Sequence, residues 1–174
     1  MKELKDYIRT IPDFPKEGIM FRDVTTVISD ADGFGLAIDD MQSALEGIDF
    51  DAVAGIESRG FIFGAPIAYN LGKAFVPIRK KGKLPHKTIE ESYALEYGNA
   101  TIEIHEDAIK PGQKVVLVDD LIATGGSMKA AVNLIEKLGG EVVKILFLIE
   151  LTDLHGRAVL EGYDVYSSTE FEGE

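Results

Sequence analysis

Two acidic residues followed by a glycine-rich turn are the residues of this sequence whose types and spacing best suit chemistry. Residues 115–127 read VVLVDDLIATGGS: an apolar run, the pair Asp119 and Asp120, and then small and hydroxyl-bearing residues. Glycines let the backbone approach a ligand closely, and the free N–H groups at the start of a following helix favour an anion. We therefore expect a phosphate to bind at the turn formed by Ala123, Thr124, Gly125, Gly126 and Ser127.

The acid pair predicts a second kind of ligand beside the phosphate. Asp119 and Asp120 would repel a phosphate, so we expect them to face hydroxyl groups or a divalent cation, for which carboxylate oxygens are suitable ligands. A phosphorylated sugar accompanied by Mg²⁺ satisfies both halves of the segment. The alternative is an acid pair that merely ends a strand beside an ordinary glycine-rich turn.

The elements that must position these residues follow an α/β pattern. Residues 115–118 predict a strand that is buried on both faces and ends just before the acid pair. Residues 52–56 predict a second such strand, followed by a polar loop at 57–60 and a helix from about 61 to 71. Because ligands gather at the carboxyl ends of strands in open α/β sheets, the two loops should share one crevice. Arg59 would then bind pyrophosphate, for which a planar guanidinium is suited.

A basic cluster follows a third predicted strand, at residues 74–78. Its members stand in a chain that is otherwise acidic, and they are Arg79, Lys80, Lys81, Lys83, His86 and Lys87. This local concentration of positive charge predicts a site for one small polyanion rather than for a polymer. The alternative is a solvated basic loop.

The residues after the basic cluster predict a lid. Residues 82–98 contain two glycines, one proline and no convincing periodicity, which indicates a long loop, and long ordered loops commonly close over sites. Glu96 and Tyr97 would bring a carboxyl group for proton transfer and a hydrogen-bonding aromatic ring. Residues 101–105 alternate in polarity, so with residues 92–95 they are expected to form an edge hairpin.

The N-terminal segment predicts a flap over a flat ligand. Met20, Phe21 and Arg22 combine apolar bulk with a charge, which suits the covering of an aromatic base. The alternative for Phe21 is that its ring only seals the core. Residues 142–149 predict a fully apolar strand, and Leu151 at its end would reach the same crevice. The alternative for Leu151 is an ordinary core position.

The helices predicted on either side of these strands are scaffold. Phe34, Ile38, Met41 and Leu45 fall on one helix face, with Asp30 among the available caps. A second helix follows the glycine-rich turn and ends at about residue 138.

These motifs carry a resemblance to a known family. An apolar run, Asp-Asp, two apolar residues and Ala-Thr-Gly-Gly-Ser resemble the 5-phosphoribosyl-1-pyrophosphate (PRPP) signature of the type I phosphoribosyltransferases. Residues 21–23, 55–64, 79–85 and 92–98 resemble, in the same order, the members of that family that use adenine. The resemblance covers nearly the whole chain.

The resemblance implies a fold and an organisation. The expected fold is α/β, with an open central parallel sheet of about five strands flanked by helices, in a single domain over residues 1–174. A hood within residues 1–30 and a flexible loop at 82–98 would cover the site. The resemblance also implies a homodimer and a non-proline cis peptide in the 57–60 loop.

The implied reaction transfers the phosphoribosyl group of PRPP to N9 of adenine, giving AMP and pyrophosphate in purine salvage, with Mg²⁺. Asp119 and Asp120 would bind the ribose hydroxyls, directly or through metal-bound water. By the resemblance, catalysis would use Glu96, Tyr97 and Arg59; pyrophosphate would contact Ser58, Arg59, Lys80, Lys83 and Lys87; and adenine would contact Met20, Phe21, Arg22 and Leu151. Ser127 stands where Thr is also common in the family, and the role of His86 stays open.

Composition excludes several other classes of function. The 174 residues are 45% hydrophobic and 28% charged, which is ordinary for one globular domain. The chain has no cysteine, so disulfides, thiolate nucleophiles and thiolate metal sites are excluded, and its three histidines lack ligand-like spacing. A net charge of −12 opposes binding to nucleic acid or acidic membranes. With no long apolar run and no apolar leader, a cytoplasmic protein is expected.

Two other functions remain as alternatives. A phosphoribosyltransferase for hypoxanthine, guanine or xanthine would share every motif above, because backbone recognition by the hood leaves no base-specific side chain visible. A PRPP- or purine-sensing regulator would keep the fold without catalysis, but the sequence offers no basic face for DNA. A dinucleotide-binding enzyme is excluded by the lack of a GxGxxG turn.

Overall fold

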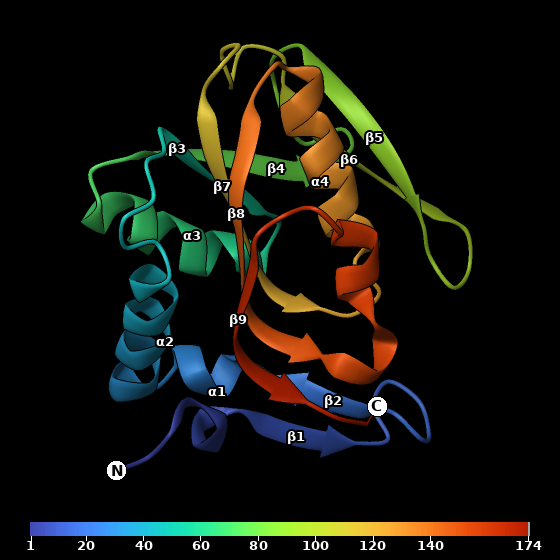
Figure 1. Cartoon of the computed structure of the whole chain (residues 1–174). Coiled ribbons are helices and arrows are strands. Elements are labelled where there is room, and N and C mark those ends of the chain that lie inside the picture. The colour runs from blue at the N-terminus through green and yellow to red at the C-terminus, as the bar shows by residue number, and fades with distance from the viewer. Residues whose placement is uncertain (174) are drawn as a thin grey trace.

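The computed structural model describes residues 1–173, and within them the core is one seven-stranded sheet with helices on both faces (Figure 1). From one edge to the other the strands are β5 (Thr88–Ala94), β6 (Asn99–His105), β4 (Ala74–Lys80), β3 (Ala52–Ile56), β7 (Lys114–Ile122), β8 (Glu141–Leu151) and β9 (Val165–Phe171). The strands β4, β3, β7, β8 and β9 are parallel to one another, whereas β6 is antiparallel to both β4 and β5. The expected open parallel sheet of about five strands is confirmed.

Strand β7 lies at the centre because its side chains are apolar on both faces. Val115 and Leu117 point into the core layer on one side of the sheet, and Val116 and Val118 point into the layer on the other. All four are fully buried, as the pleat of a strand covered on both faces requires.

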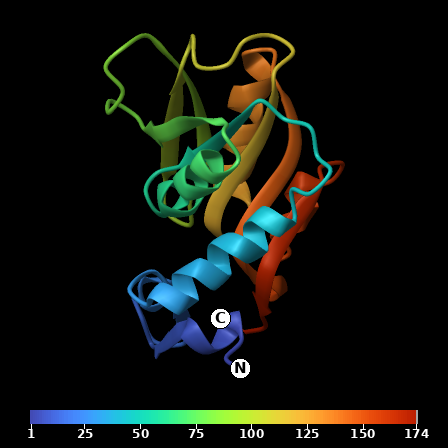
Figure 2. The same cartoon turned by 90° about the vertical axis from the view of Figure 1, so that its left-hand side faces the viewer.

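The two core layers are each closed by helices. Helices α2 (Ala31–Ser43) and α3 (Arg59–Asn70) cover one face of the sheet, and α4 (Gly126–Lys137) covers the other (Figure 2). The Asp30 side chain caps α2 by accepting hydrogen bonds from the N–H groups of Asp32 and Gly33, each at 3.0 Å. Asp30 is thus the cap among the candidates that the sequence offers.

The antiparallel hairpin β5–β6 corrects the prediction of a long irregular loop at residues 82–98. Residues 88–94 form β5, which pairs in register with β6 from Thr88 opposite His105 to Ala94 opposite Asn99. The edge hairpin predicted from residues 92–95 and 101–105 is confirmed, but β5 begins earlier, at Thr88. Its first half was not predicted because neither face of the strand is a continuous apolar surface. Whether the hairpin tip is mobile stays a prediction.

The N-terminal residues form a small separate sheet at the carboxyl end of the parallel strands (Figure 1). After a short 3₁₀ turn at Leu4–Tyr7, β1 (Arg9–Pro12) pairs with β2 (Met20–Asp23), and α1 (Thr25–Ile28) follows. We call residues 9–25 the hood. Strand β1 was not predicted, because its short run ends in a proline.

The C-terminal residues complete the sheet. Two 3₁₀ turns, Thr152–Leu154 and Gly156–Leu160, lead from β8 to β9, which adds the fifth parallel strand. Strand β9 was not evident from the sequence because its middle, Ser167, Ser168 and Thr169, is polar. Strand β9 brings the end of the described chain beside the hood (Figure 1).

Candidate active site

The glycine-rich turn connects the end of β7 to the first turn of α4. Gly125 is the residue before the helix and has φ of 86°. A Cβ atom there would lie 2.6 Å from the carbonyl oxygen of Gly156 and 2.5 Å from Cγ2 of Val159, so both the conformation and the space require glycine. The N–H groups at the start of this 12-residue helix have no partners within the helix and favour an anion at the turn.

The acid pair lies inside β7, which corrects the prediction that the strand ends before it. Strand β7 continues to Ile122 because its backbone stays paired with β8, with Asp119 opposite Phe147 and Ile122 opposite Glu150. The two carboxyl groups therefore occupy a rigid strand close to its carboxyl end rather than a loop.

A cavity of about 680 Å³ joins the glycine-rich turn to the tip of the β5–β6 hairpin. Its lining residues are Tyr93, Ala94, Leu95, Glu96, Leu121, Ala123, Thr124, Gly125, Gly126 and Ser127. The structure thus brings together the five residues expected to bind phosphate and the carboxyl group of Glu96. Their roles in ligand binding stay predictions.

Arg59 and the acid pair meet where β3 and β7 end. The Nε atom of Arg59 lies 2.5 Å from Oδ2 of Asp120, whose side chain is almost fully buried, while half of the Arg59 side chain is exposed. The Asp120 carboxylate raises the pKa of Arg59. Limited exposure and the adjacent Asp120 carboxylate raise the pKa of Asp119 well above its usual range. The convergence of the 57–60 loop and the acid pair is confirmed.

Close packing of the backbone makes this convergence possible. A Cβ atom at Gly60 would lie 2.8 Å from the carbonyl oxygen of Val118 and 3.1 Å from Oδ1 of Asp119. Only glycine lets the start of α3 approach β7 so closely. The peptide bond between Glu57 and Ser58 is cis, as the resemblance implies.

Glu57 connects this loop to the basic cluster, a role that the sequence analysis did not assign. Its carboxylate accepts hydrogen bonds from the Lys80 backbone N–H at 2.8 Å and the Lys83 ammonium at 3.1 Å, and pairs with the Arg79 guanidinium at 3.4 Å. Burial alone would raise the pKa of Glu57, but these contacts lower it to about 2. No local signal in the sequence marked Glu57, because its partners lie 22 to 26 residues further along the chain.

The other predicted pyrophosphate contacts are open to solvent. Ser58, Lys80 and Lys87 are exposed, and Lys83 is half exposed while paired with Glu57. Nε2 of His86 lies 3.8 Å from the Asp107 carboxylate, and the His86 backbone N–H donates to Nε2 of His105. The structure thus leaves Lys80 and Lys87 free to reach an anion.

A second, smaller cavity of about 340 Å³ lies under the hood. It is lined by Ile11, Phe14, Phe21, Arg22, Asp23, Val24, Thr25 and Arg59. The rings of Phe14 and Phe21 meet edge to face with centroids 5.1 Å apart, so one wall is aromatic. Arg59 belongs both to this cavity and to the acid pair, which places the aromatic wall beside the predicted ribose site.

Three of the predicted adenine contacts are placed less directly. Met20 is 38% exposed and lines neither cavity, and Leu151 packs against the buried core. The Arg22 guanidinium donates to the Thr10 hydroxyl at 2.6 Å and stacks 4.3 Å from the Phe171 ring. Of the four, Phe21 and Arg22 line the cavity under the hood, and the Phe21 ring forms part of its aromatic wall.

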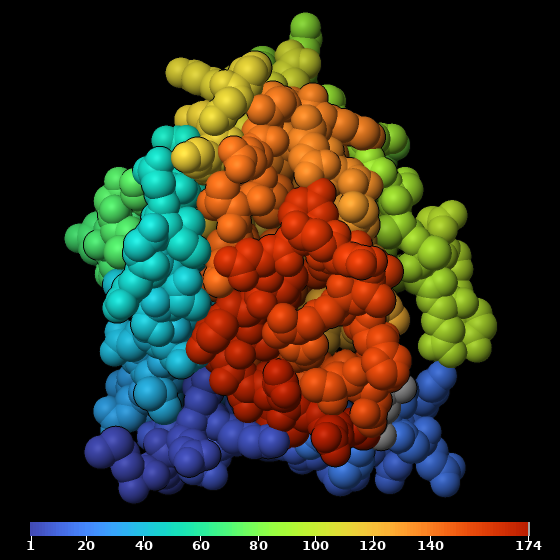
Figure 3. Space-filling view, viewed as in Figure 1, coloured from blue at the N-terminus to red at the C-terminus, as the bar shows by residue number. Residues whose placement is uncertain are grey.

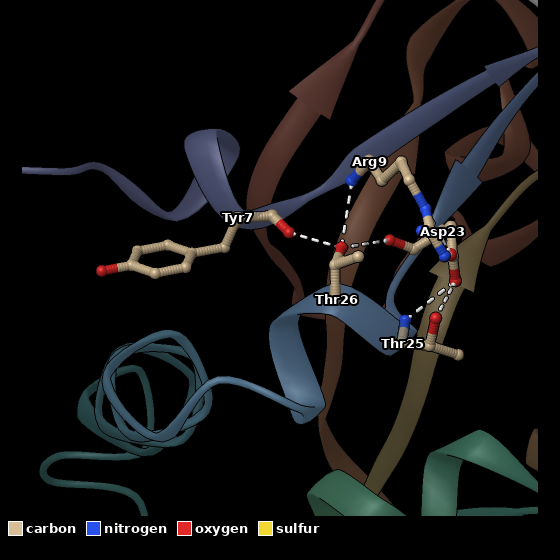
Figure 4. A network of polar contacts seen from close by, with 5 residues as sticks. All are labelled: Tyr7, Arg9, Asp23, Thr25 and Thr26. Atoms are coloured by element: carbon tan, nitrogen blue, oxygen red, sulfur yellow. Dashed lines mark hydrogen bonds and ion pairs between the residues drawn. The ribbon is translucent and has the colours of Figure 1, made fainter.

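A polar network holds the hood in position (Figure 4). The Asp23 carboxylate accepts from the Thr25 hydroxyl at 2.7 Å, from the Thr25 N–H at 2.9 Å and from Nε of Arg9 at 3.1 Å. The Thr26 hydroxyl donates to the Tyr7 carbonyl at 2.6 Å. The Thr25 and Arg9 hydrogen bonds lower the pKa of Asp23 to about 2.

The hairpin tip presents one of its two predicted groups to the cavity. Glu96 lines the cavity, whereas Tyr97 is 84% exposed and does not. Tyr93, which the sequence analysis did not single out, lines the cavity instead. Its Cδ2 atom would be 3.6 Å from a Cβ at Gly126. The signal was the alternation of Ile89, Glu91 and Tyr93, which turns these residues to the same side of β5.

Comparison with known proteins identifies the family. A family model described as a phosphoribosyl transferase domain matches residues 35–172. The chain belongs to the phosphoribosyltransferase family. The phosphoribosyltransferase relatives include the adenine phosphoribosyltransferase of Agathobacter rectalis, 66% identical over 174 residues and 100% of both chains. That of Lachnoclostridium phytofermentans is 64% identical, again over 100% of both chains.

Solved phosphoribosyltransferase structures share the fold along almost the whole chain. The adenine phosphoribosyltransferase of Thermoanaerobacter pseudethanolicus has 55% identity and a TM-score of 0.93, covering 97% of this chain and 98% of its own. The Saccharomyces cerevisiae enzyme, in a structure complexed with adenine, has 39% identity and a TM-score of 0.90, covering 95% and 96%. Within residues 1–173, every helix of this phosphoribosyltransferase is too short or too polar to cross a lipid bilayer.

Proposed function

We propose that the protein is an adenine phosphoribosyltransferase of purine salvage, which converts PRPP and adenine into AMP and pyrophosphate. The observation that carries the proposal is the convergence of a phosphate turn, an acid pair and an aromatic hood in a chain that matches relatives of that name along its full length. Each part suits one portion of the two substrates.

The phosphoribosyl group binds along β7 and the start of α4. The N–H groups of residues 123–127 and the hydroxyls of Thr124 and Ser127 bind the 5-phosphate, with the helix N-terminus adding favourable charge. Asp119 and Asp120 accept hydrogen bonds from the ribose hydroxyls. Because both carboxyl groups stand on a rigid strand, the ribose is oriented before reaction.

Pyrophosphate binds to the cations around the 57–60 loop. The exposed part of Arg59, together with Ser58, Lys80, Lys83 and Lys87, supplies donors for the leaving group. These donors stabilise the charge that develops on the leaving oxygen as its bond to the sugar breaks.

Mg²⁺ is part of the proposal. Within residues 1–173, no group of three or more His, Cys, Asp or Glu side chains could hold a metal ion by itself. Asp119 and Asp120 instead fit an ion that takes its other ligands from substrate oxygens and water, as Mg²⁺ commonly does. When bound, the ion would neutralise charge on the pyrophosphate.

Adenine binds under the hood, against the aromatic wall that contains Phe14 and Phe21. Arg22, the Met20 backbone and Leu151 complete the base site in this proposal. The lone pair of N9 forms the new bond to C1 of the ribose while the bond from C1 to oxygen breaks, and its electron pair leaves with pyrophosphate. The proton on N7 of adenine passes to the carboxylate of Glu96, which lines the cavity at the hairpin tip and approaches the hood through its ion pair with Lys16. Tyr97 adds its hydrogen-bonding aromatic ring to the site when the hairpin tip closes over it.

We place this reaction in the cytoplasm and in a homodimer. PRPP carries several negative charges that prevent it from crossing a bilayer, so an enzyme that consumes it works in the compartment that holds it. The resemblance to the family supports the homodimer, and light scattering of the purified protein tests it.

An assay with several bases tests the proposed function. Purified protein is given PRPP, Mg²⁺ and one of adenine, hypoxanthine, guanine or xanthine, and the nucleotide is measured by chromatography. AMP formed from adenine alone is the expected result. Turnover of another base would replace the proposed substrate, and PRPP binding without any turnover would indicate a sensor instead of an enzyme.

A further inference from the structure

Glu57 is a nearly buried acid at the end of β3 that no step of the proposed reaction uses. Its side chain is 9% exposed and is surrounded by groups of the basic cluster. The carboxylate contacts the backbone N–H of Lys80, the ammonium of Lys83 and the guanidinium of Arg79. One carboxylate thus holds the end of β4 and the turn that follows it.

The basic cluster needs such an anchor. Arg79, Lys80, Lys81 and Lys83 are close in sequence and repel one another, and the ends of their side chains would otherwise disperse into solvent. Arg79 and Lys80 pair with Glu103 and Ile102 of β6, and the Lys81 N–H donates to the Thr101 carbonyl at 3.1 Å. These contacts fix the backbone and not the ends of the basic side chains. The Glu57 carboxylate opposes the repulsion from a site with little screening by water.

The position of Glu57 in the chain links two groups of cations. Ser58 and Arg59 follow it directly, and Arg59 is fixed by Asp120 of β7. In the basic turn at residues 79–83, Glu57 holds the side chains of Arg79 and Lys83, while the backbone N–H groups of Lys81 and Gly82 are bound by residues of β6. Residues 57–59 therefore set the distance between Arg59 and the basic turn.

We propose that Glu57 is a positioning residue for the pyrophosphate site: it holds the 79–83 turn at a fixed place relative to Arg59, so that a diphosphate meets both. The inference rests on the proposed function, in which these cations bind the leaving group. Glu57 acts through Arg79 and Lys83 and does not touch substrate, since an anion there would repel the diphosphate.

A neighbouring acid provides a matched control. Glu90 on β5 pairs with Lys81 of the same turn at 3.0 Å, but both side chains are at least half exposed. An exposed pair of this kind contributes little. Glu57→Gln and Glu90→Gln each remove one negative charge beside the same basic turn, and only the first removes the anchor.

Steady-state kinetics and calorimetry test the proposal. Glu57→Gln should raise KM for PRPP about tenfold and weaken pyrophosphate binding by a similar factor. A change of about this size is expected when the charge-assisted hydrogen bonds of one carboxylate are lost. KM for adenine should stay within about twofold, and Glu90→Gln should match the wild type. Unchanged pyrophosphate binding in Glu57→Gln, or an equal loss in Glu90→Gln, would overturn the proposal.

Two further arrangements keep the test decisive. If Glu57→Gln does not fold, Glu57→Asp replaces it, because this side chain keeps the charge but is too short to reach Lys83. Glu57→Asp should also weaken pyrophosphate binding. If it binds pyrophosphate as tightly as the wild type does, the proposal is overturned. Calorimetry with pyrophosphate needs no turnover. A wild-type protein that binds pyrophosphate but forms no AMP would therefore refute the proposed function while leaving the Glu57 comparison intact.

Discussion

Lys16 of the hood and Glu96 of the hairpin tip form an ion pair that joins these two segments. The Nζ atom of Lys16 lies 3.3 Å from Oε1 of Glu96, although 80 residues separate them in sequence. Figure 3 shows the hairpin standing out from the body and approaching the N-terminal segment. Both side chains are more than half exposed, so the pair orients Glu96 without contributing much stability.

Glu96 should matter for the rate of reaction and Lys16 much less. Glu96→Gln removes the group that accepts the adenine proton, and we expect kcat to fall by about 10² or more with KM for PRPP little changed. Lys16→Met removes only an exposed partner worth less than about 1 kcal/mol, so kcat should change less than about fivefold. Steady-state assays compare the two, and equal losses would contradict the role of Glu96.

Gly125 should be intolerant of a side chain. Gly125→Ala places a Cβ at a φ of 86° and against Gly156 and Val159, so we expect a loss of more than about 2 kcal/mol in the free energy of unfolding and a higher KM for PRPP. Gly72→Ala is the control, since Gly72 has φ of 65° but open space around it, and should cost only about 1 kcal/mol. Urea denaturation measures both, and similar losses would refute the packing argument.

Tyr93 should contribute to binding of the phosphoribosyl group. Tyr93→Phe keeps the ring beside Gly126 but removes the hydroxyl from the cavity, so KM for PRPP should rise about three- to tenfold with the melting temperature unchanged. Tyr69→Phe on α3, whose side chain is 87% exposed and lines neither cavity, should leave both quantities unchanged. A wild-type KM in Tyr93→Phe would remove this residue from the site.

The folded protein should lose stability in acid because of Asp23 and Glu57. The pKa of each is about 2 in the folded state, below the ordinary values of 3.8 and 4.5, so their stabilisation is complete above about pH 5. It should decline as pH falls from about 5 to about 2, while the raised pKa of Asp119 acts in the opposite sense. Asp23→Asn should make the decline of unfolding free energy shallower, and Asp39→Asn, at an exposed position, should not. If the unfolding free energy of Asp23→Asn falls with pH as steeply as that of the wild type, the contacts of Asp23 in the hood do not provide this stability.

The parts of the fold that the sequence predicted are those with strong local patterns. Residues 115–118 are apolar on both faces, so the strand was evident, and Asp30 was a recognisable cap. The end of β7 was misplaced because its last residues are held by pairing with β8 rather than by composition. The first half of β5 and all of β9 were missed for the same reason, since these polar residues are held by pairing with a neighbouring strand rather than by an apolar face.

The candidate site also has a part that the sequence predicted and a part that it did not. The glycine-rich turn, the acid pair and Arg59 lie together as expected, because the carboxyl ends of β3 and β7 are adjacent in one parallel sheet. Glu57 and Tyr93 escaped notice because their meaning lies in contacts with Lys83 and Gly126, which no local motif announces. Conversely, Met20 and Leu151 took their roles from resemblance, and neither side chain lines a cavity in this structure.

The most direct measurement is AMP formation from adenine and PRPP by the wild type and by the double variant Asp119→Asn/Asp120→Asn. Circular dichroism first establishes that the variant is folded, since Asp120 also pairs with Arg59. We expect AMP from the wild type and a loss of at least about a hundredfold in kcat/KM for PRPP in the variant, because the ribose loses its anchoring carboxylates. A folded variant with wild-type kcat/KM would show that the reaction takes place elsewhere.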